Sequence, residues 1–245
     1  MKKKLNKFKT SLSPNFSSRK KKIKYIIIHY TGMESLSDTL ELFVSAKSKV
    51  SCHWLISRKG VLYKIVEENK VAWHAGISYW KGEKNLNNSS IGIELENRGH
   101  GKEYKPFTNS QLLTLEKLIK RIKIEYNLNS VDVIGHADIA PFRKSDPGEL
   151  FDWERLAKKK LVFWPKIQKQ KIDMNLLQIG EKSKRVLEVK RKLRKIGYKC
   201  SSNNTYDLSL KLVVEAFQRR FLPDRINGII DGKVYLRIIN VSKNT

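Results

Sequence analysis

Residues 23–29 constrain the fold more than any other part of this sequence. They read IKYIIIH, a run of β-branched and aromatic residues that is too continuous for a strand with one solvated face. The run predicts a strand in the middle of a sheet, and it ends on the polar triplet His29, Tyr30 and Thr31. A histidine is therefore expected at the end of a buried central strand.

The segments that follow supply neighbours for this strand. Strands are predicted at residues 53–57, 61–66, 91–97 and 131–135, and the glycine of Arg58-Lys59-Gly60 suits a short hairpin between the first two. Amphipathic spacing predicts a helix over residues 38–50. Thr108 and Gln111 form a capping box that opens a longer helix, which should cover the sheet. The expected fold class is α/β, a mixed central β-sheet flanked by helices.

The chain divides into four predicted parts. Residues 1–22 are basic and contain no acidic residue, which predicts a flexible arm. Residues 23–165 form the α/β domain, and residues 166–180, rich in Lys and Gln, read as a linker. Residues 181–245 predict a small three-helix domain with its own apolar set, in which Gly197 ends the first helix and Asp207 caps the second.

The charge of the chain predicts an anionic partner, although any single run of lysines can also be a solvated surface. Its 50 Lys and Arg outnumber 24 Asp and Glu, giving a formal net charge of +26. Charge alone leaves nucleic acid, an anionic membrane face and an acidic wall polymer open. The sequence contains no nucleic-acid recognition motif, so nucleic acid is not expected as a partner.

No apolar run approaches the roughly 20 residues of a membrane span, and no signal-peptide core follows the basic start. We expect a monomer.

Three residues predict a metal site with catalytic character. A catalytic zinc ion takes three N or O ligands from the protein and keeps a fourth position for water. His29 and His136 follow the ends of predicted strands, and Asp146 lies ten residues after His136 in an extended segment. The edge of a sheet can bring all three together, so the sequence predicts one zinc ion per chain.

Two further residues suit hydrolysis at such a metal. In an extended segment residues i and i+2 point to the same side, so Lys144 accompanies Asp146 and would place an ammonium beside a developing oxyanion. Ile91, Ile93 and Leu95 face one side of their strand, while Glu94 and Glu96 face the other. Glu94 is the candidate acid/base, although periodicity alone does not separate it from Glu96.

At these positions the sequence resembles the zinc-dependent N-acetylmuramoyl-L-alanine amidases, a family that also includes peptidoglycan recognition proteins. The likeness rests on IIIHYT, SCHWLISRKG, WHAG, SIGIELEN and GHADIAPFRKSDPG, which occur in the family order. The resemblance implies that His29, His136 and Asp146 bind zinc, Glu94 is the acid/base and Lys144 stabilises the oxyanion. It further implies hydrolysis of the amide between N-acetylmuramoyl, or anhydro-muramoyl, residues and L-alanine in peptidoglycan or muropeptides.

Other features leave alternatives open. His74 either contacts the substrate or braces its loop, and Trp73 either stacks on sugar or packs. The tail resembles the three-helix peptidoglycan-binding module of wall hydrolases, which favours the cell envelope over the cytoplasm. The alternative function is a non-catalytic protein that binds or recognises peptidoglycan.

Overall fold

The computed structural model describes residues 8–166 and 172–244, and its centre is one mixed six-stranded sheet. The strands run in the order β1-β5-β4-β9-β3-β10, and all neighbours are parallel except the β4–β5 hairpin. Their bounds are Lys9–Thr10 (β1), Tyr25–Tyr30 (β3), Trp54–Ile56 (β4), Leu62–Lys64 (β5), Ser90–Leu95 (β9) and Val133–Gly135 (β10). The predicted mixed sheet is confirmed, with β3 inside it.

The helices follow the expected order along the chain. They are α1 (Leu36–Val44), α2 (Asn109–Tyr126), α3 (His136–Ile139), α4 (Trp153–Lys158), α5 (Lys184–Ile196), α6 (Leu208–Phe221) and α7 (Gly232–Lys243). The structure also contains two short antiparallel strand pairs, β2 (Phe16–Ser18) with β6 (Lys70–Ala72) and β7 (Tyr79–Trp80) with β8 (Glu83–Lys84). Two 3-10 turns are formed by Leu86–Ser89 and Ser130–Asp132. No helix among the described residues has the length and apolarity that crossing a bilayer requires.

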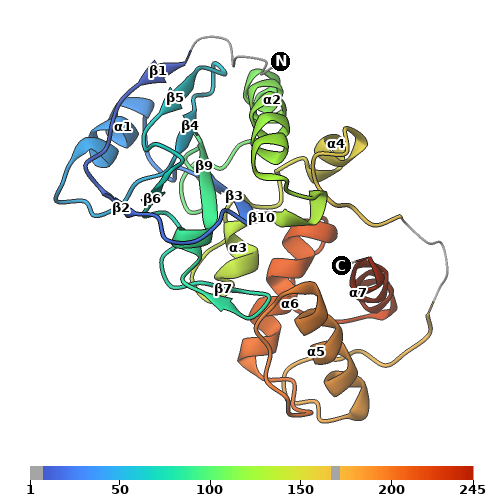
Figure 1. Cartoon of the computed structure of the whole chain (residues 1–245). Coiled ribbons are helices and arrows are strands. Elements are labelled where there is room, and N and C mark those ends of the chain that lie inside the picture. Colours follow the sequence, from blue (N-terminus) through green and yellow to red (C-terminus); the bar gives the residue numbers. More distant parts are fainter. Residues whose placement is uncertain (1–7, 167–171, 245) are drawn as a thin grey trace.

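The two faces of the sheet are covered by different parts of the chain (Figure 1). Ile26 and Ile28 of β3 are buried in one cluster with the apolar side of α2. Tyr25 and Ile27 point to the opposite face, as alternation along a strand requires, and are buried in one cluster with α5, α6 and α7. The C-terminal helices therefore complete the core of the sheet, in place of the separate apolar set that the sequence predicted.

Residues 8–22 are not the flexible arm that was predicted. β1 adds to the edge of the sheet beside β5, and β2 pairs with β6. The guanidinium of Arg19 is half-buried between these segments, where it donates to the carbonyl oxygens of Lys70 at 2.6 Å and Asn88 at 2.6 Å. These carbonyls hold the segment in place and compensate the charge of Arg19. Residues 1–7 of the arm and 167–171 of the predicted linker lie outside the described residues.

Helix α1 ends earlier than the predicted residue 50. Its N-cap is Ser35, whose side chain accepts a hydrogen bond from Asp38 N, and its last residue is Val44. Beyond it the amide of Asn15 donates to the carbonyl oxygens of Ser45, at 2.8 Å, and Val50, at 3.1 Å. The N-terminal segment thus holds residues 45–50 in a turn, a long-range effect that local periodicity does not contain.

Candidate active site

Three parallel strands place the predicted residues at one edge of the sheet. β9 and β10 flank β3, with Glu94 in register with His29 and Gly135 in register with Ile28. His136 follows Gly135 directly and so emerges beside His29. The side chains of Ile91, Ile93 and Leu95 are buried on the α2 side, so Glu94 points to the same side as His29, as predicted.

Asp146 is brought to this edge by a long loop. Its carbonyl oxygen accepts a hydrogen bond from Ala137 N at 2.8 Å, which fastens the loop to the first turn of α3. Asp146 Oδ2 then lies 3.1 Å from His29 Nδ1 and 3.0 Å from His136 Nδ1, and the two nitrogens are 2.9 Å apart. All three side chains are buried.

These three atoms fit a metal ion. A tetrahedral zinc ion bound at about 2.1 Å holds its ligand atoms roughly 3.4 Å apart, close to the triangle formed here. Burial and the neighbouring His136 lower the pKa of His29 to about 4, so its ring is neutral. Burial opposes ionisation of Asp146, but the two histidines outweigh it and lower the pKa of its carboxyl. Neutral imidazole and an ionised carboxylate are the forms that bind metal.

A cavity of about 190 Å³ opens onto this cluster. Glu94 and Lys144, predicted as acid/base and oxyanion donor, both line it, as do Trp73 and His74. The structure thus brings the three predicted ligands together with Glu94, Lys144, Trp73 and His74. An apolar wall formed by Met33, Leu42, Phe43 and Val50 completes the lining.

The environment of Glu94 differs from that of Glu96. Among the described residues, no hydrogen-bond partner reaches Glu94 Oε2, which is buried. Burial and the charge of Asp146 raise the pKa of Glu94 to about 8, while Lys144 acts in the opposite direction. Glu96 instead accepts a hydrogen bond from Arg58 N at 2.7 Å and does not line the cavity. Of the two carboxylates that the pattern left open, only Glu94 faces the cluster formed by His29, His136 and Asp146.

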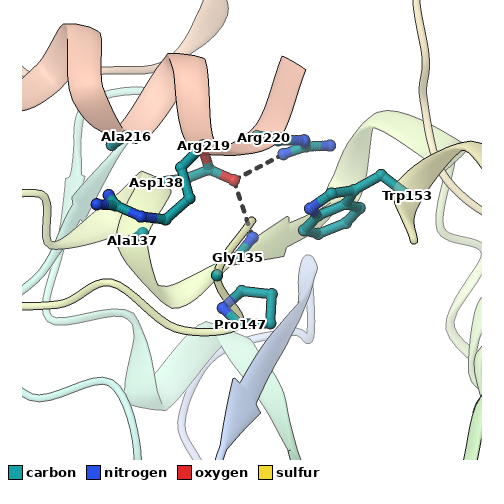
Figure 2. A pocket seen from close by; sticks show the side chains of 9 residues that line it. Gly135, Ala137, Asp138, Pro147, Trp153, Ala216, Arg219 and Arg220 are labelled. Atoms are coloured by element: carbon teal, nitrogen blue, oxygen red, sulfur yellow. Dashed lines mark hydrogen bonds and ion pairs between the residues drawn. The ribbon is translucent and has the colours of Figure 1, made fainter. Parts of the chain in front are cut away.

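A second buried group, which sequence reasoning missed, supports the turn that carries His136 (Figure 2). Asp138 Oδ2 accepts hydrogen bonds from Gly135 N at 2.9 Å and from Arg220 of α6 at 2.8 Å. The hydroxyl of Tyr198 donates to Asp138 Oδ1 at 2.5 Å. The guanidinium of Arg220 lies over the Trp153 ring, with Cζ 4.4 Å from the ring centroid. Asp138 is visible in the GHADIAP segment, but its partners lie 60 and 82 residues away.

Comparisons with known proteins agree with this geometry. A family model described as N-acetylmuramoyl-L-alanine amidase matches residues 19–149, which contain the three candidate metal ligands, Glu94 and Lys144. The chain belongs to the N-acetylmuramoyl-L-alanine amidase family. It is an amidase of the α/β fold expected for that family.

Similarity to individual relatives extends beyond the matched domain of this amidase. The chain is 36% identical to the N-acetylmuramoyl-L-alanine amidase AmiD of Escherichia coli over 230 residues, 86% of this chain and 79% of AmiD. The solved structure of AmiD with the substrate anhydro-N-acetylmuramic acid-L-Ala-D-gamma-Glu-L-Lys has a TM-score of 0.78, with 31% identity, and covers 95% of this chain and 90% of AmiD.

A shorter relative matches only the catalytic part. The 1,6-anhydro-N-acetylmuramyl-L-alanine amidase AmpD of Haemophilus influenzae is 44% identical over 108 residues, which are 44% of this chain and 56% of AmpD. The match with AmiD therefore takes in much more of this amidase than the match with AmpD does.

Proposed function

We propose that this amidase hydrolyses the amide between the lactyl group of N-acetylmuramoyl, or anhydro-muramoyl, residues and L-alanine, using one zinc ion held by His29, His136 and Asp146. The observation that carries the proposal is Glu94 Oε2, a buried carboxylate oxygen without a hydrogen-bond partner among the described residues, beside this three-ligand cluster. Three protein ligands with a cavity beside them are typical of catalytic rather than structural zinc. The names of AmiD and AmpD support the substrate class.

The chain's own residues divide the chemistry between them. A bound zinc ion supplies a water of lowered pKa and polarises a carbonyl oxygen. A cation bound beside Glu94 would favour its ionised form over the protonated form that burial favours, and Glu94 would then take the proton from the attacking water and return it to the leaving amine of L-alanine. Lys144, on the cavity wall, stabilises the negative charge that develops on the carbonyl oxygen. The apolar wall excludes bulk water around these charges.

Hydrolysis of defined substrates tests the proposal. Purified zinc-loaded enzyme is incubated with sacculi and with anhydro-muropeptides, and released peptides are separated by chromatography and identified by mass. We expect peptides with a free L-alanine amine, and none from Glu94→Gln, which retains its zinc. A protein that only binds peptidoglycan would pellet with sacculi and release no peptide from either substrate. The same comparison measures preference between intact wall and anhydro fragments.

We also propose that residues 23–165 carry the reaction while residues 181–245 add affinity for the wall in the cell envelope. The outward side of α5 carries Lys184, Arg191 and Lys195, with Lys199 just beyond, and all four are exposed. These cations suit the carboxylates of a wall polymer. Reversing the four charges should weaken salt-sensitive pelleting with sacculi while leaving hydrolysis of small muropeptides unchanged. Cell fractionation tests the compartment, and recovery of the enzyme with soluble cytoplasmic proteins would refute it.

A monomer is sufficient for this function. The three proposed ligands, Glu94 and Lys144 all line one cavity of one chain. We therefore propose that the active enzyme is a monomer, which light scattering at assay concentrations would test.

A further inference from the structure

In both proposed zinc histidines, His29 and His136, Nε2 is the ring nitrogen that points away from the metal site, and we call it the outer nitrogen. Two consecutive residues, His74 and Ala75, contact these outer nitrogens. A neutral histidine carries one proton, and only the nitrogen without it can bind a metal. The hydrogen bond at the outer nitrogen therefore decides which nitrogen faces the metal. The hydrogen-bond pattern around His29 and His136 can be followed atom by atom to see where each proton lies.

The assignment for His136 rests on the carbonyl oxygen of Ala75, which lies 3.2 Å from Nε2. A carbonyl oxygen only accepts, so Nε2 donates its proton there when a metal takes the lone pair of Nδ1. Arg143, whose guanidinium lies 3.4 Å from the same Nε2, donates to the Ala75 carbonyl instead. The lone pair of His136 is then on Nδ1, the atom that faces His29 and Asp146.

The assignment for His29 runs through two side chains. Ser90 Oγ lies 2.7 Å from the carbonyl oxygen of Leu86 and must donate its single proton there. The same hydroxyl lies 3.2 Å from His74 Nε2 and so accepts from it. His74 then has its lone pair on Nδ1, which is 3.0 Å from His29 Nε2 and accepts the proton of that nitrogen. The lone pair of His29 is thereby left on Nδ1, at the metal cluster.

The surroundings hold His74 in the position that this chain of bonds needs. Asn87 Oδ1 accepts from His74 N at 3.0 Å and from Ala75 N at 2.7 Å, which fixes the backbone of the loop. Gly92 of β9 lies under the His74 ring, where any Cβ atom would clash with it.

We propose that His74, oriented by Ser90, is a positioning residue that keeps the proton of His29 on Nε2 and leaves Nδ1 free for the metal. The inference rests on the proposed zinc site and goes beyond it, because it gives the WHAG segment a defined role. His74 neither binds zinc nor acts on the substrate in this scheme. Reversal of this series of hydrogen bonds would place a proton on His29 Nδ1, where Asp146 Oδ2 at 3.1 Å would accept it in place of a metal, and would cost Ser90 its bond to Leu86.

Zinc affinity measured by chelator competition tests the proposal without any substrate. Ser89 provides a matched control, because its hydroxyl also approaches the Leu86 carbonyl, at 3.4 Å, whereas the hydroxyl beside His74 Nε2 is that of Ser90. We expect His74→Ala and Ser90→Ala to weaken zinc binding by roughly 10- to 100-fold. Ser89→Ala should bind zinc like the wild-type enzyme. Ser90→Ala removes only one hydroxyl, so it keeps the test valid where His74→Ala fails to fold.

A second readout follows the proton itself. In ¹⁵N-histidine-labelled, metal-free protein, the ¹⁵N shifts of His29 should report the Nε2–H form in the wild type and in Ser89→Ala. Ser90→Ala should show an increased share of the Nδ1–H form. Unchanged zinc affinity and unchanged His29 shifts in both His74→Ala and Ser90→Ala would overturn the inference. Failure of the wild-type enzyme to bind zinc would instead overturn the proposed function, so the two failures are distinguishable.

Discussion

Replacement of Arg220 by methionine should destabilise the whole enzyme, although the residue lies outside the matched family domain. Arg220 donates to Asp138 at 2.8 Å and to the carbonyl oxygen of Val133 at 3.1 Å, and both charged side chains are buried. Arg220→Met leaves the Asp138 carboxylate buried without its cation, which typically costs about 3 to 5 kcal/mol. The loss would be a large share of the roughly 5 to 15 kcal/mol of a typical domain.

Urea denaturation of the full chain measures this cost. The double variant Arg220→Met/Asp138→Asn should recover part of the lost stability, because no uncompensated charge is then buried. Arg219→Met is the matched control, since Arg219 makes only a long ion pair with Glu149, at 3.4 Å and between partly exposed side chains, and its loss should cost less than that of Arg220. A loss for Arg220→Met no larger than that of Arg219→Met, or a double variant that recovers nothing, would refute the reasoning.

Three further changes act closer to the metal cluster. In the folded protein the pKa of Glu94 is raised to about 8, so the metal-free wild type loses stability as the pH rises from 5 to 9. Glu94→Gln lacks this titration, and its free energy of unfolding relative to the wild type should therefore increase over the same range. Urea midpoints measured across this range test the difference. Lys144→Met should lower kcat by about 10²- to 10³-fold with little change in KM. A rise in KM with an unchanged kcat would contradict its role at the oxyanion. Gly92→Ala should displace the His74 ring and lower zinc affinity by about tenfold or more in a chelator titration, and unchanged affinity would exclude a tight fit there.

Much of the site could be predicted because its residues occupy positions that local patterns define. The continuous apolar run ending at His29 identified a central strand, and alternation in the later strand placed Glu94 opposite the core side. Parallel neighbours of a central strand end at the same edge, so His136 had to emerge near His29. The capping box at Thr108 is likewise local and is present in the structure.

What could not be predicted depends on contacts between distant segments. Nothing near residue 74 shows that its ring reaches His29, 45 residues away, or that Ser90 determines its proton. The lysines that dominate the first 22 residues predict a solvated arm, whereas the half-buried Arg19 and the pairing of β1 and β2 fix residues 8–22 against the rest of the domain. Likewise, the helical pattern of the tail showed an apolar side but not the surface that it covers.

The burial of Ile27 and the C-terminal helices in one cluster has a consequence for synthesis of the chain. The ribosome releases the segments carrying His29, His136 and Asp146 well before α6 and α7, which complete the second face of the sheet. Until then that apolar face is open to solvent and to other nascent chains, a state prone to aggregation. Translation must therefore proceed beyond α7 before the enzyme can close its core.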